Sequence, residues 1–376
     1  MSVPHVRFDG SLRVASIFPT VGRYALSGIE SGRGARLAVE DLNRRGGIHG
    51  RPLKLLEYQT GSYFVDARQA ADLAAGEGGA LAIVGANSSS LSMPIAEVAE
   101  ARGVVQVSNI STAEDLTWDP ASGRERPYVF RVCGSDTVMG ALLAEFAARR
   151  LHARRVAVLF EVGGAYSARL AQSFIKCFRA PATSRVVEEF FYLPREIDFR
   201  GQLREIKAFR PDVIFLPGFF SDATLVARQA ADLGLTAPLL GGDGWSNRVL
   251  FKRAHPAGPA YYADLCSPPQ AFRERYLSVY GEEAEGCRAV LAYDAVLALA
   301  QALSTVGPLS DADLTSDLPA VRERLRRALL RVDFVGHTGR IRFDEHRNRA
   351  GGMAIMELVC GAERCVPRLY PAGHAS

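Results

Sequence analysis

The chain has 376 residues, enough for two domains of ordinary size. Hydrophobic residues make up 48% and charged residues 23%, the balance of a globular protein with a sizeable core. The formal net charge of +4 is small and the arginines are scattered among acids, so the sequence argues against a nucleic-acid partner. No apolar run reaches 18 residues, and we expect no membrane span.

Predicted strands and helices alternate in the first third of the chain. LRVASIF (12–18) predicts a buried strand, and residues 29–45 predict a helix that ends at two glycines. Strands LKLLEYQ and ALAIVGA follow, each with a helix after it from about Val65 and Ser90, and VVQVSN leads into a loop. This alternation predicts a parallel sheet with helices on both faces.

The same rhythm restarts after YVFRVC. The predicted strands are RVAVLFEV, SRVVEEFFYL, VIFLPG and APLLGG, and helices are predicted to begin near Tyr166, Phe199, Asp222 and Ser246. The sequence therefore predicts an α/β protein with two doubly wound parallel-sheet lobes.

The last 110 residues break this rhythm. They predict helices at 269–280, 288–304 and 318–330, and then the extended segments GRIRFDEH and GGMAIMELVCGAERCVPRLY. A second lobe that already has its strands does not need three more helices, so we expect the chain to return to the first lobe near 267 and to cross again near 338. The predicted lobes are 1–134 with 267–338 and 135–266 with 339–376, joined by three short hinge crossovers.

The cysteines and the first residues leave two questions open. None of the six cysteines forms a CxxC pair, but Cys360 and Cys365 flank GAER in an expected hairpin, and a disulfide there depends on the pairing register. The opening MSVPHVRFDG lacks the basic start and apolar stretch of a secretory signal. A cytoplasmic location and a removed leader both stay open.

Ligand-binding sites in doubly wound folds lie at the carboxyl ends of the parallel strands. In the first lobe the loops there are rich in hydroxyl groups, which belong to Ser88, Ser89, Ser90, Ser111 and Thr112. Helix starts carry unpaired N–H groups and a partial positive charge, so these two clusters together favour an anion site such as one for a carboxylate. The alternative for each hydroxyl is that it only caps its own helix.

The corresponding loops of the second lobe offer the opposite chemistry. Asp243 stands between glycines in GGDGWSN, and the aromatic residues near it are Tyr166, Phe219, Phe220 and Trp245. An acid among aromatic rings suits an ammonium group. The two lobes together predict a site for an α-amino acid, whereas the alternative makes Asp243 a cap for the helix expected at Ser246.

Several segments resemble one protein family. GIESGRGARLAVEDLNRRGGIHGRPLKLLEYQ looks like the N-terminal signature of type I periplasmic binding proteins of the leucine/isoleucine/valine-binding family. IVGANSSS, YVFRVCGSD, GGAYSARLAQSF, DFRGQLREIKAFRPDVIFLPG, RQAADLGL and GRIRFDEHRNR are similar to that family in the same order. The resemblance runs from about Leu12 to Tyr370. It implies a protein that captures a ligand between two hinged lobes and delivers it to an ABC transporter permease, in the periplasm or anchored outside the cytoplasm. Separately, we expect a monomer without cofactor or metal.

The resemblance also implies roles for individual residues. The family's carboxylate-binding serine falls on Ser89, and its two partners, which include backbone groups, fall on Ile110 and Thr112. The tyrosine after the first strand of the second lobe is Tyr166, and the acid that holds the ligand's ammonium is Asp243.

Two positions depart from the family pattern. Phe219 stands where members often have a tyrosine, and Ser27 where they often have an aromatic residue. The cysteine pair that some members carry in the first lobe is missing. We expect an amino acid with an aliphatic or aromatic side chain, although Ser27 leaves room for a larger or more polar one.

Enzymatic motifs are missing from the sequence. It contains no GxxxxGK[ST], HExxH or GxSxG, and the two glycines of SGRGARLA lie in a predicted helix, where small residues favour close helix packing. We therefore expect no catalysis. The main rival is a cytoplasmic sensor of the same fold that binds an amide, a urea-like compound or an aromatic acid and signals to a regulatory partner.

Overall fold

The computed structural model describes residues 9–180, 185–247, 255–266, 268–284, 286–349, 353–360 and 365–369. The chain divides into two compact units, residues 1–134 with 268–352 (unit 1) and residues 135–267 with 353–376 (unit 2). The third crossing near 338 is therefore a wrong prediction, since the chain stays in unit 1 up to Gly352. The reason is long-range bonding, because Arg349 donates hydrogen bonds to the carbonyl oxygens of Thr338 (2.6 Å) and Val132 (3.4 Å) in unit 1.

Unit 1 contains a five-stranded parallel sheet in the order β2-β1-β3-β4-β7. Its strands are β1 (Leu12–Pro19), β2 (Leu53–Thr60), β3 (Ala82–Gly85), β4 (Val105–Ser108) and β7 (Val129–Arg131). All eight residues of β1 are buried, as expected for a central strand covered on both faces. This order puts the topological switch point between β1 and β3, where crossovers leave the sheet in opposite directions.

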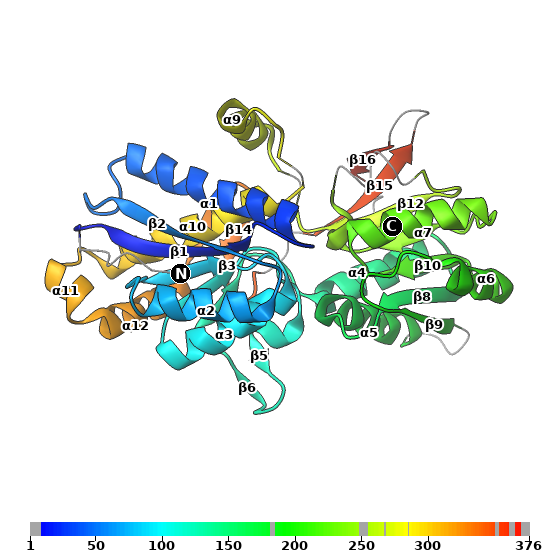
Figure 1. Cartoon of the computed structure of the whole chain (residues 1–376), viewed down its shortest axis with the longest axis horizontal. Helices are drawn as coiled ribbons and strands as arrows, with labels where there is room; N and C mark the ends of the chain where they lie inside the picture. The colour runs from blue at the N-terminus through cyan, green and yellow to red at the C-terminus, as the bar shows by residue number, and fades with distance from the viewer. Residues whose placement is uncertain are drawn as a thin grey trace. The chain divides into compact units, whose positions relative to one another are not determined.

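Helices cover both faces of this sheet (Figure 1). On one face α1 (Ala25–Arg44) packs against α10 (Arg288–Val306), and on the other α2 (Phe64–Ala75) packs against α3 (Ser89–Arg102). The remaining elements of unit 1 are η1 (Glu114–Leu116), α9 (Gln270–Tyr280), α11 (Asp311–Thr315), α12 (Leu318–Leu329) and the two hairpins β5 (Trp118–Asp119)–β6 (Arg124–Glu125) and β13 (Asp333–Gly336)–β14 (Gly339–Arg342).

Helix α10 is long and apolar enough to cross a membrane, unlike any other helix in the described part of the chain. In the structure 72% of its apolar window is buried, and α10 contacts α1, α12, β3 and β4. The burial and the contacts identify α10 as a core helix of unit 1.

Unit 2 repeats the plan of unit 1. Its sheet has the order β16-β15-β12-β11-β10-β8-β9, in which the five strands from β12 to β9 are parallel and β15 and β16 add antiparallel pairs at one edge. The strands are β8 (Arg155–Glu161), β9 (Val186–Tyr192), β10 (Val213–Leu216), β11 (Leu239–Gly241), β12 (Ala260–Asp264), β15 (Ala354–Cys360) and β16 (Cys365–Leu369). The helices are α4 (Asp136–Arg149), α5 (Ala165–Arg179), α6 (Arg200–Phe209), α7 (Phe220–Asp232) and the short η2 (Asp243–Trp245). The predicted α/β fold with two doubly wound sheets is confirmed.

Some elements differ from their predictions. The sequence analysis did not predict β12, whose AYYAD is too short for a clear period, nor the β5–β6 hairpin. The hairpin of Cys360 and Cys365 forms with these residues opposite one another, but their side chains lie outside the described part of the structure, and so does the disulfide left open there. The helix expected from Ser246 falls on residues 248–254, which are also outside it.

Candidate functional site

The hydroxyl groups predicted for an anion site gather at the carboxyl ends of β3 and β4 in unit 1. Ser88 precedes α3 and Ser89 begins it, while Ser111 and Thr112 lie in the loop after β4. Ser89, Ser111 and Thr112 are buried, with exposed fractions of 2%, 1% and 1%. The side-chain oxygen of Ser89 accepts a hydrogen bond from the N–H of Ala113 (3.3 Å) and so joins the two loops.

A network of further hydroxyl groups supports these loops from below. Ser92 lies 2.8 Å from Ser111 between side-chain oxygens, and it also accepts a hydrogen bond from the N–H of Ala86 (2.9 Å). The side chain of Ser108 accepts from the N–H of Ser111 (3.1 Å). Ser111 is therefore a structural link between the loops, since its hydroxyl is engaged with Ser92 and Ala86.

Thr112 differs from its neighbours in this cluster. Its hydroxyl oxygen is buried and has no hydrogen-bond partner among the described residues. A buried hydroxyl without a partner is costly, roughly 1–3 kcal/mol, unless a ligand or water satisfies it. Within this cluster of hydroxyl groups, Thr112 is thus a side chain with an unused capacity to bind a polar group.

The other candidates of unit 1 are less enclosed. Ser90 is exposed, and Ile110 and Ser27 are half-buried. Ser27 lies in the first turn of α1, which begins four residues earlier than predicted, and its carbonyl oxygen accepts a hydrogen bond from Ser31 (2.9 Å). The amide of Asn87 donates to the carbonyl of Tyr24 (3.3 Å) and so ties the loop after β3 to the loop after β1, at the switch point of the sheet.

In unit 2, Tyr166 and Phe219 meet at the corresponding switch point, between β8 and β10. Tyr166 lies in the first turn of α5 and Phe219 directly precedes α7, and their ring centroids are 5.2 Å apart. Phe219 is held by its own N–H, which donates to the carboxylate of Asp222 (3.2 Å). Tyr166 is buried, and its hydroxyl accepts a hydrogen bond from the N–H of Gly244 (3.1 Å).

Asp243 lies in the turn after the next strand, β11, and is half-buried. Its neighbours must be glycines because other groups pass too close for a Cβ atom. A Cβ on Gly242 would come within 2.4 Å of the Tyr166 hydroxyl oxygen, and one on Gly244 within 2.7 Å of the Gly218 carbonyl oxygen. The glycines thus let the turn press against Tyr166, which places the Asp243 carboxylate beside the phenol.

This proximity changes the electrostatics of the phenol. The pKa of Tyr166 is raised well above its ordinary value, first because the phenol is buried, and then because the negative charges of Asp243 and Asp136 disfavour the phenolate. A hydrogen bond between Tyr166 and Asp243 acts in the same direction. Asp136, buried at the start of α4, was missed by the sequence analysis, and only the folded structure shows that it is near Tyr166.

This pKa shift has a measurable consequence. In the unfolded chain a tyrosine ionises near pH 10, so above about pH 10 the folded state holds a proton that the unfolded state has lost, and stability falls with pH. We expect the free energy of unfolding of Tyr166→Phe to fall less steeply than that of the wild type, by up to about 1.4 kcal/mol per pH unit between about pH 10 and 11. Urea unfolding at several pH values measures this, with the exposed Tyr63→Phe as control. Equal slopes for Tyr166→Phe and wild type would contradict the assigned environment.

Trp245 does not present its ring as predicted. It is 1% exposed and belongs to the hydrophobic core of unit 2, and its indole N–H donates to the carbonyl of Leu216 (3.1 Å). Its ring lies against Gly241, where a Cβ would come within 2.1 Å of it. Trp245 supports the Asp243 turn from beneath.

The capping alternative for Asp243 concerns the helix expected from Ser246, and that helix lies outside the described residues. The residue before η2 is Gly242, without a side-chain cap, and the N–H of Ser246 bonds to the main-chain carbonyl of Asp243 (3.0 Å). A main-chain hydrogen bond of residue 243 therefore closes η2.

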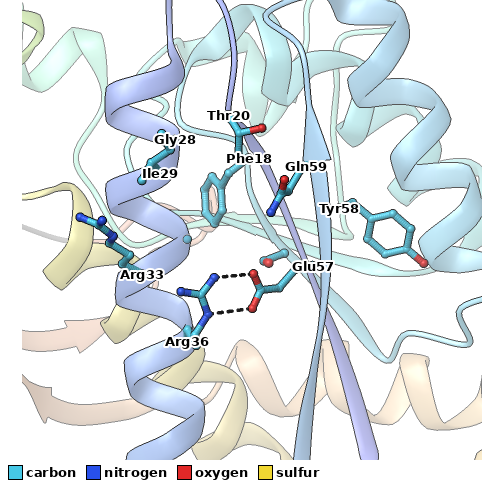
Figure 2. Close-up of a pocket in the computed structure, with 11 residues that line it drawn as sticks. Phe18, Thr20, Gly28, Ile29, Arg33, Arg36, Glu57, Tyr58 and Gln59 are labelled. Carbon is cyan, nitrogen blue, oxygen red and sulfur yellow. Dashed lines mark hydrogen bonds and ion pairs between the residues drawn. The ribbon is translucent and has the colours of Figure 1, made fainter. Parts of the chain in front are cut away.

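A pocket elsewhere in unit 1 is a weaker candidate (Figure 2). It lies between α1 and the strands β1 and β2, and the guanidinium of Arg36 donates two hydrogen bonds, of 2.9 and 2.6 Å, to the carboxylate of Glu57 across it. Arg33 points away from this pair and bonds to Glu282. The charged residues that line this pocket, Arg33, Arg36 and Glu57, already pair with protein groups. They are therefore not free to bind the charged group of a ligand.

The two units thus carry complementary groups. Unit 1 offers a buried hydroxyl and helix-start N–H groups, which suit an anion, and unit 2 offers a carboxylate against aromatic rings, which suits a cation. Among the described residues, no group of three or more His, Cys, Asp or Glu side chains is arranged to hold a metal ion.

Comparisons with known proteins agree with the fold. The profile of the periplasmic binding protein family matches residues 11–362. The Leu/Ile/Val-binding protein BraC3 of Rhizobium johnstonii is 30% identical over 236 residues, which are 63% of this chain and 62% of that protein. An amino acid binding protein of Pseudomonas aeruginosa is 31% identical over 260 residues, 68% of this chain and 66% of that protein. These matches span somewhat less than two thirds of each relative.

A solved structure extends the likeness to nearly the whole chain. The crystal structure of the leucine binding protein LivK from Thermotoga maritima matches with a TM-score of 0.82 at 27% identity and covers 95% of this chain and 97% of that one. With the family match over residues 11–362 and two doubly wound units in one chain, the protein belongs to the type I periplasmic binding proteins of the leucine/isoleucine/valine-binding family.

Proposed function

We propose that the protein binds a small L-amino acid with an aliphatic or aromatic side chain and delivers it to the permease of an ABC transporter. The observation that carries this proposal is the division of charge chemistry between the units. Thr112 keeps a buried hydroxyl free for a carboxylate, and Asp243 holds a carboxylate against Tyr166 for an ammonium group. An α-amino acid has both groups on one carbon atom.

The names of the relatives support the same ligand class. BraC3 is a Leu/Ile/Val-binding protein, and the Thermotoga maritima protein is a leucine binding protein. Their family also supports an extracytoplasmic location and a permease partner for this chain, which acts by capturing a ligand and needs no catalytic group.

The surface of unit 1 supports an apolar side chain on the ligand. The loops after β1 and β2 expose Val21 (62%) and Tyr63 (64%), and the first turns of α1 and α2, which follow these loops, expose Leu26 (57%) and Phe64 (66%). These loops are joined through Ser62, which accepts a hydrogen bond from the N–H of Tyr24 (3.1 Å) and donates to the carbonyl of Val21 (2.8 Å). The carboxyl edge of the sheet is therefore apolar at β2 and β1 and hydroxylated at β3 and β4, which suits a ligand with one apolar and one anionic end.

A thermal-shift screen tests the ligand class. A ligand that binds only the folded state, at 100 times its dissociation constant, adds about 2.7 kcal/mol to stability and raises the melting temperature. We expect L-leucine, L-isoleucine, L-valine and L-phenylalanine to include hits. Sugars, nucleosides and benzoate serve as controls. If only aromatic acids or amides respond, the sensor alternative replaces this proposal, and if only sugars or nucleosides respond, both fail.

A further inference from the structure

Arg131, the last residue of β7, is a fully buried arginine directly behind the loop that carries Thr112. Its exposed fraction is 0%. One terminal nitrogen, Nη1, donates to the carbonyl oxygens of Ser111 (3.2 Å) and Ala113 (2.8 Å). The other, Nη2, donates to Glu114 and to Thr117 (both 3.3 Å), and Nε donates to Asn348. These five hydrogen bonds match the five N–H groups of a guanidinium.

The carbonyl groups that Arg131 binds flank Thr112 on both sides. The loop from Asn109 to Ala113 has no regular secondary structure, yet most of it is buried, so its carbonyl groups need partners from elsewhere. Arg131 supplies these partners for Ser111 and Ala113. It therefore holds the main chain on either side of the unpartnered Thr112 hydroxyl.

The same contact acts electronically on Thr112. The carbonyl of Ser111 and the N–H of Thr112 belong to one peptide group. A hydrogen bond from a cation to that carbonyl polarises the peptide, and hydrogen bonds in such a chain strengthen one another. The N–H of Thr112 becomes a stronger donor toward an anion on the other side of the loop.

We propose that Arg131 is a positioning residue for carboxylate recognition: it fixes and polarises the peptide of Thr112 from behind and does not touch the ligand. This inference rests on the proposed function. Lysine cannot replace it, because one ammonium group cannot span the carbonyls of Ser111 and Ala113 together with Thr117 and Asn348.

A double-mutant cycle with L-leucine as the probe tests the proposal. We expect Arg131→Lys and Thr112→Val each to weaken leucine binding about tenfold by titration calorimetry, the loss of one good hydrogen bond. The double variant should lose less than the product of the two single losses, because a loop that Arg131 no longer fixes also misplaces the Thr112 hydroxyl, whereas valine at 112 keeps the N–H that Arg131 polarises. If the two losses multiply to about a hundredfold, or if Arg131→Lys binds leucine like the wild type, the positioning role is overturned.

Arg322 provides a matched control. It is also buried in unit 1 (5% exposed) and donates to main-chain carbonyl oxygens, those of Ala75 (2.7 Å) and Ala80 (2.7 and 3.0 Å), next to the amino end of β3. Arg322→Lys should lower the melting temperature and leave leucine affinity unchanged. An equal loss of affinity in Arg322→Lys would show that both arginines act through stability alone and would overturn the proposal.

A gentler variant covers the case in which Arg131→Lys does not fold. Asn348→Ala removes the acceptor of Nε and leaves the other contacts of Arg131 in place. We expect it to fold and to bind leucine several-fold more weakly, and unchanged affinity would overturn the inference. Failure of the wild type to bind any amino acid is distinct, because it refutes the proposed function itself.

Discussion

Asp243→Asn is expected to weaken amino-acid binding by roughly two to four powers of ten. If Asp243 is the main partner of the ligand's ammonium, the variant leaves a desolvated charge unpaired, and breaking a buried ion pair costs about 3–5 kcal/mol. Asparagine keeps the shape of aspartate. The turn itself should persist, since the N–H of Ser246 bonds to the main-chain carbonyl of residue 243.

Titration calorimetry with the best amino acid from the thermal-shift screen measures this loss. Asp212→Asn is the matched control, because Asp212 is an acid of unit 2 whose carboxylate accepts hydrogen bonds from the N–H groups of Arg154 and Arg155 (both 2.8 Å). It should reduce stability and spare affinity. If Asp243→Asn binds the amino acid as tightly as the wild type, the amine is held elsewhere, and a ligand without a charged amine becomes the better candidate.

Gly34→Ala is expected to destabilise unit 1 by about 3 kcal/mol, a large overpacking effect. Gly34 lies where α1 crosses α10, and a Cβ there would come within 1.9 Å of the carbonyl oxygen of Ala289. The two helices would have to separate along a buried contact. This crossing also explains SGRGARLA, whose small residues serve helix packing as predicted.

Gly32→Ala is the matched control two residues earlier on the same helix. Its Cβ would meet only the ring of Phe18, at 3.8 Å, which is an ordinary contact. Alanine also favours helix by about 1 kcal/mol over glycine, so we expect Gly32→Ala to be neutral or stabilising. Chemical denaturation of both variants measures the difference. Equal effects at the two positions would show that α1 and α10 are not in this close contact in solution.

The alternation of strands and helices could be predicted from the sequence because it depends on local patterns. Runs such as LRVASIF and RVAVLFEV are apolar throughout, and only strands buried on both faces tolerate that composition. The loops that follow them could be predicted as the functional edge, since parallel strands bring their carboxyl ends together. Asp243 was selected as a candidate in this way, from an acid between glycines at the end of a buried strand.

Only the tertiary structure shows which of the candidate side chains are buried in a core or already hydrogen-bonded to other residues. Trp245 and Ser111 look like binding residues in the sequence, but Trp245 fills the core of unit 2 and Ser111 is engaged with Ser92 and Ala86. No local signal distinguishes them from Thr112, because burial and hydrogen bonding depend on partners far along the chain. Arg131 could not be selected from the sequence for the same reason, since its partners Ser111 and Ala113 lie about 20 residues away along the chain.

Long-range pairing also set the limits of the two units. The segment GRIRFDEH predicts an extended strand but not its partner, and the crossing was expected near 338 for that reason. Pairing of β14 with β13, together with the bonds of Arg131 to Asn348 and of Arg349 to Val132, keeps the chain in unit 1 until Gly352. The sequence by itself determined the elements and the chemistry at their ends, whereas the folded chain decided their partners, because contacts between distant residues leave no periodic pattern in either of the segments that meet.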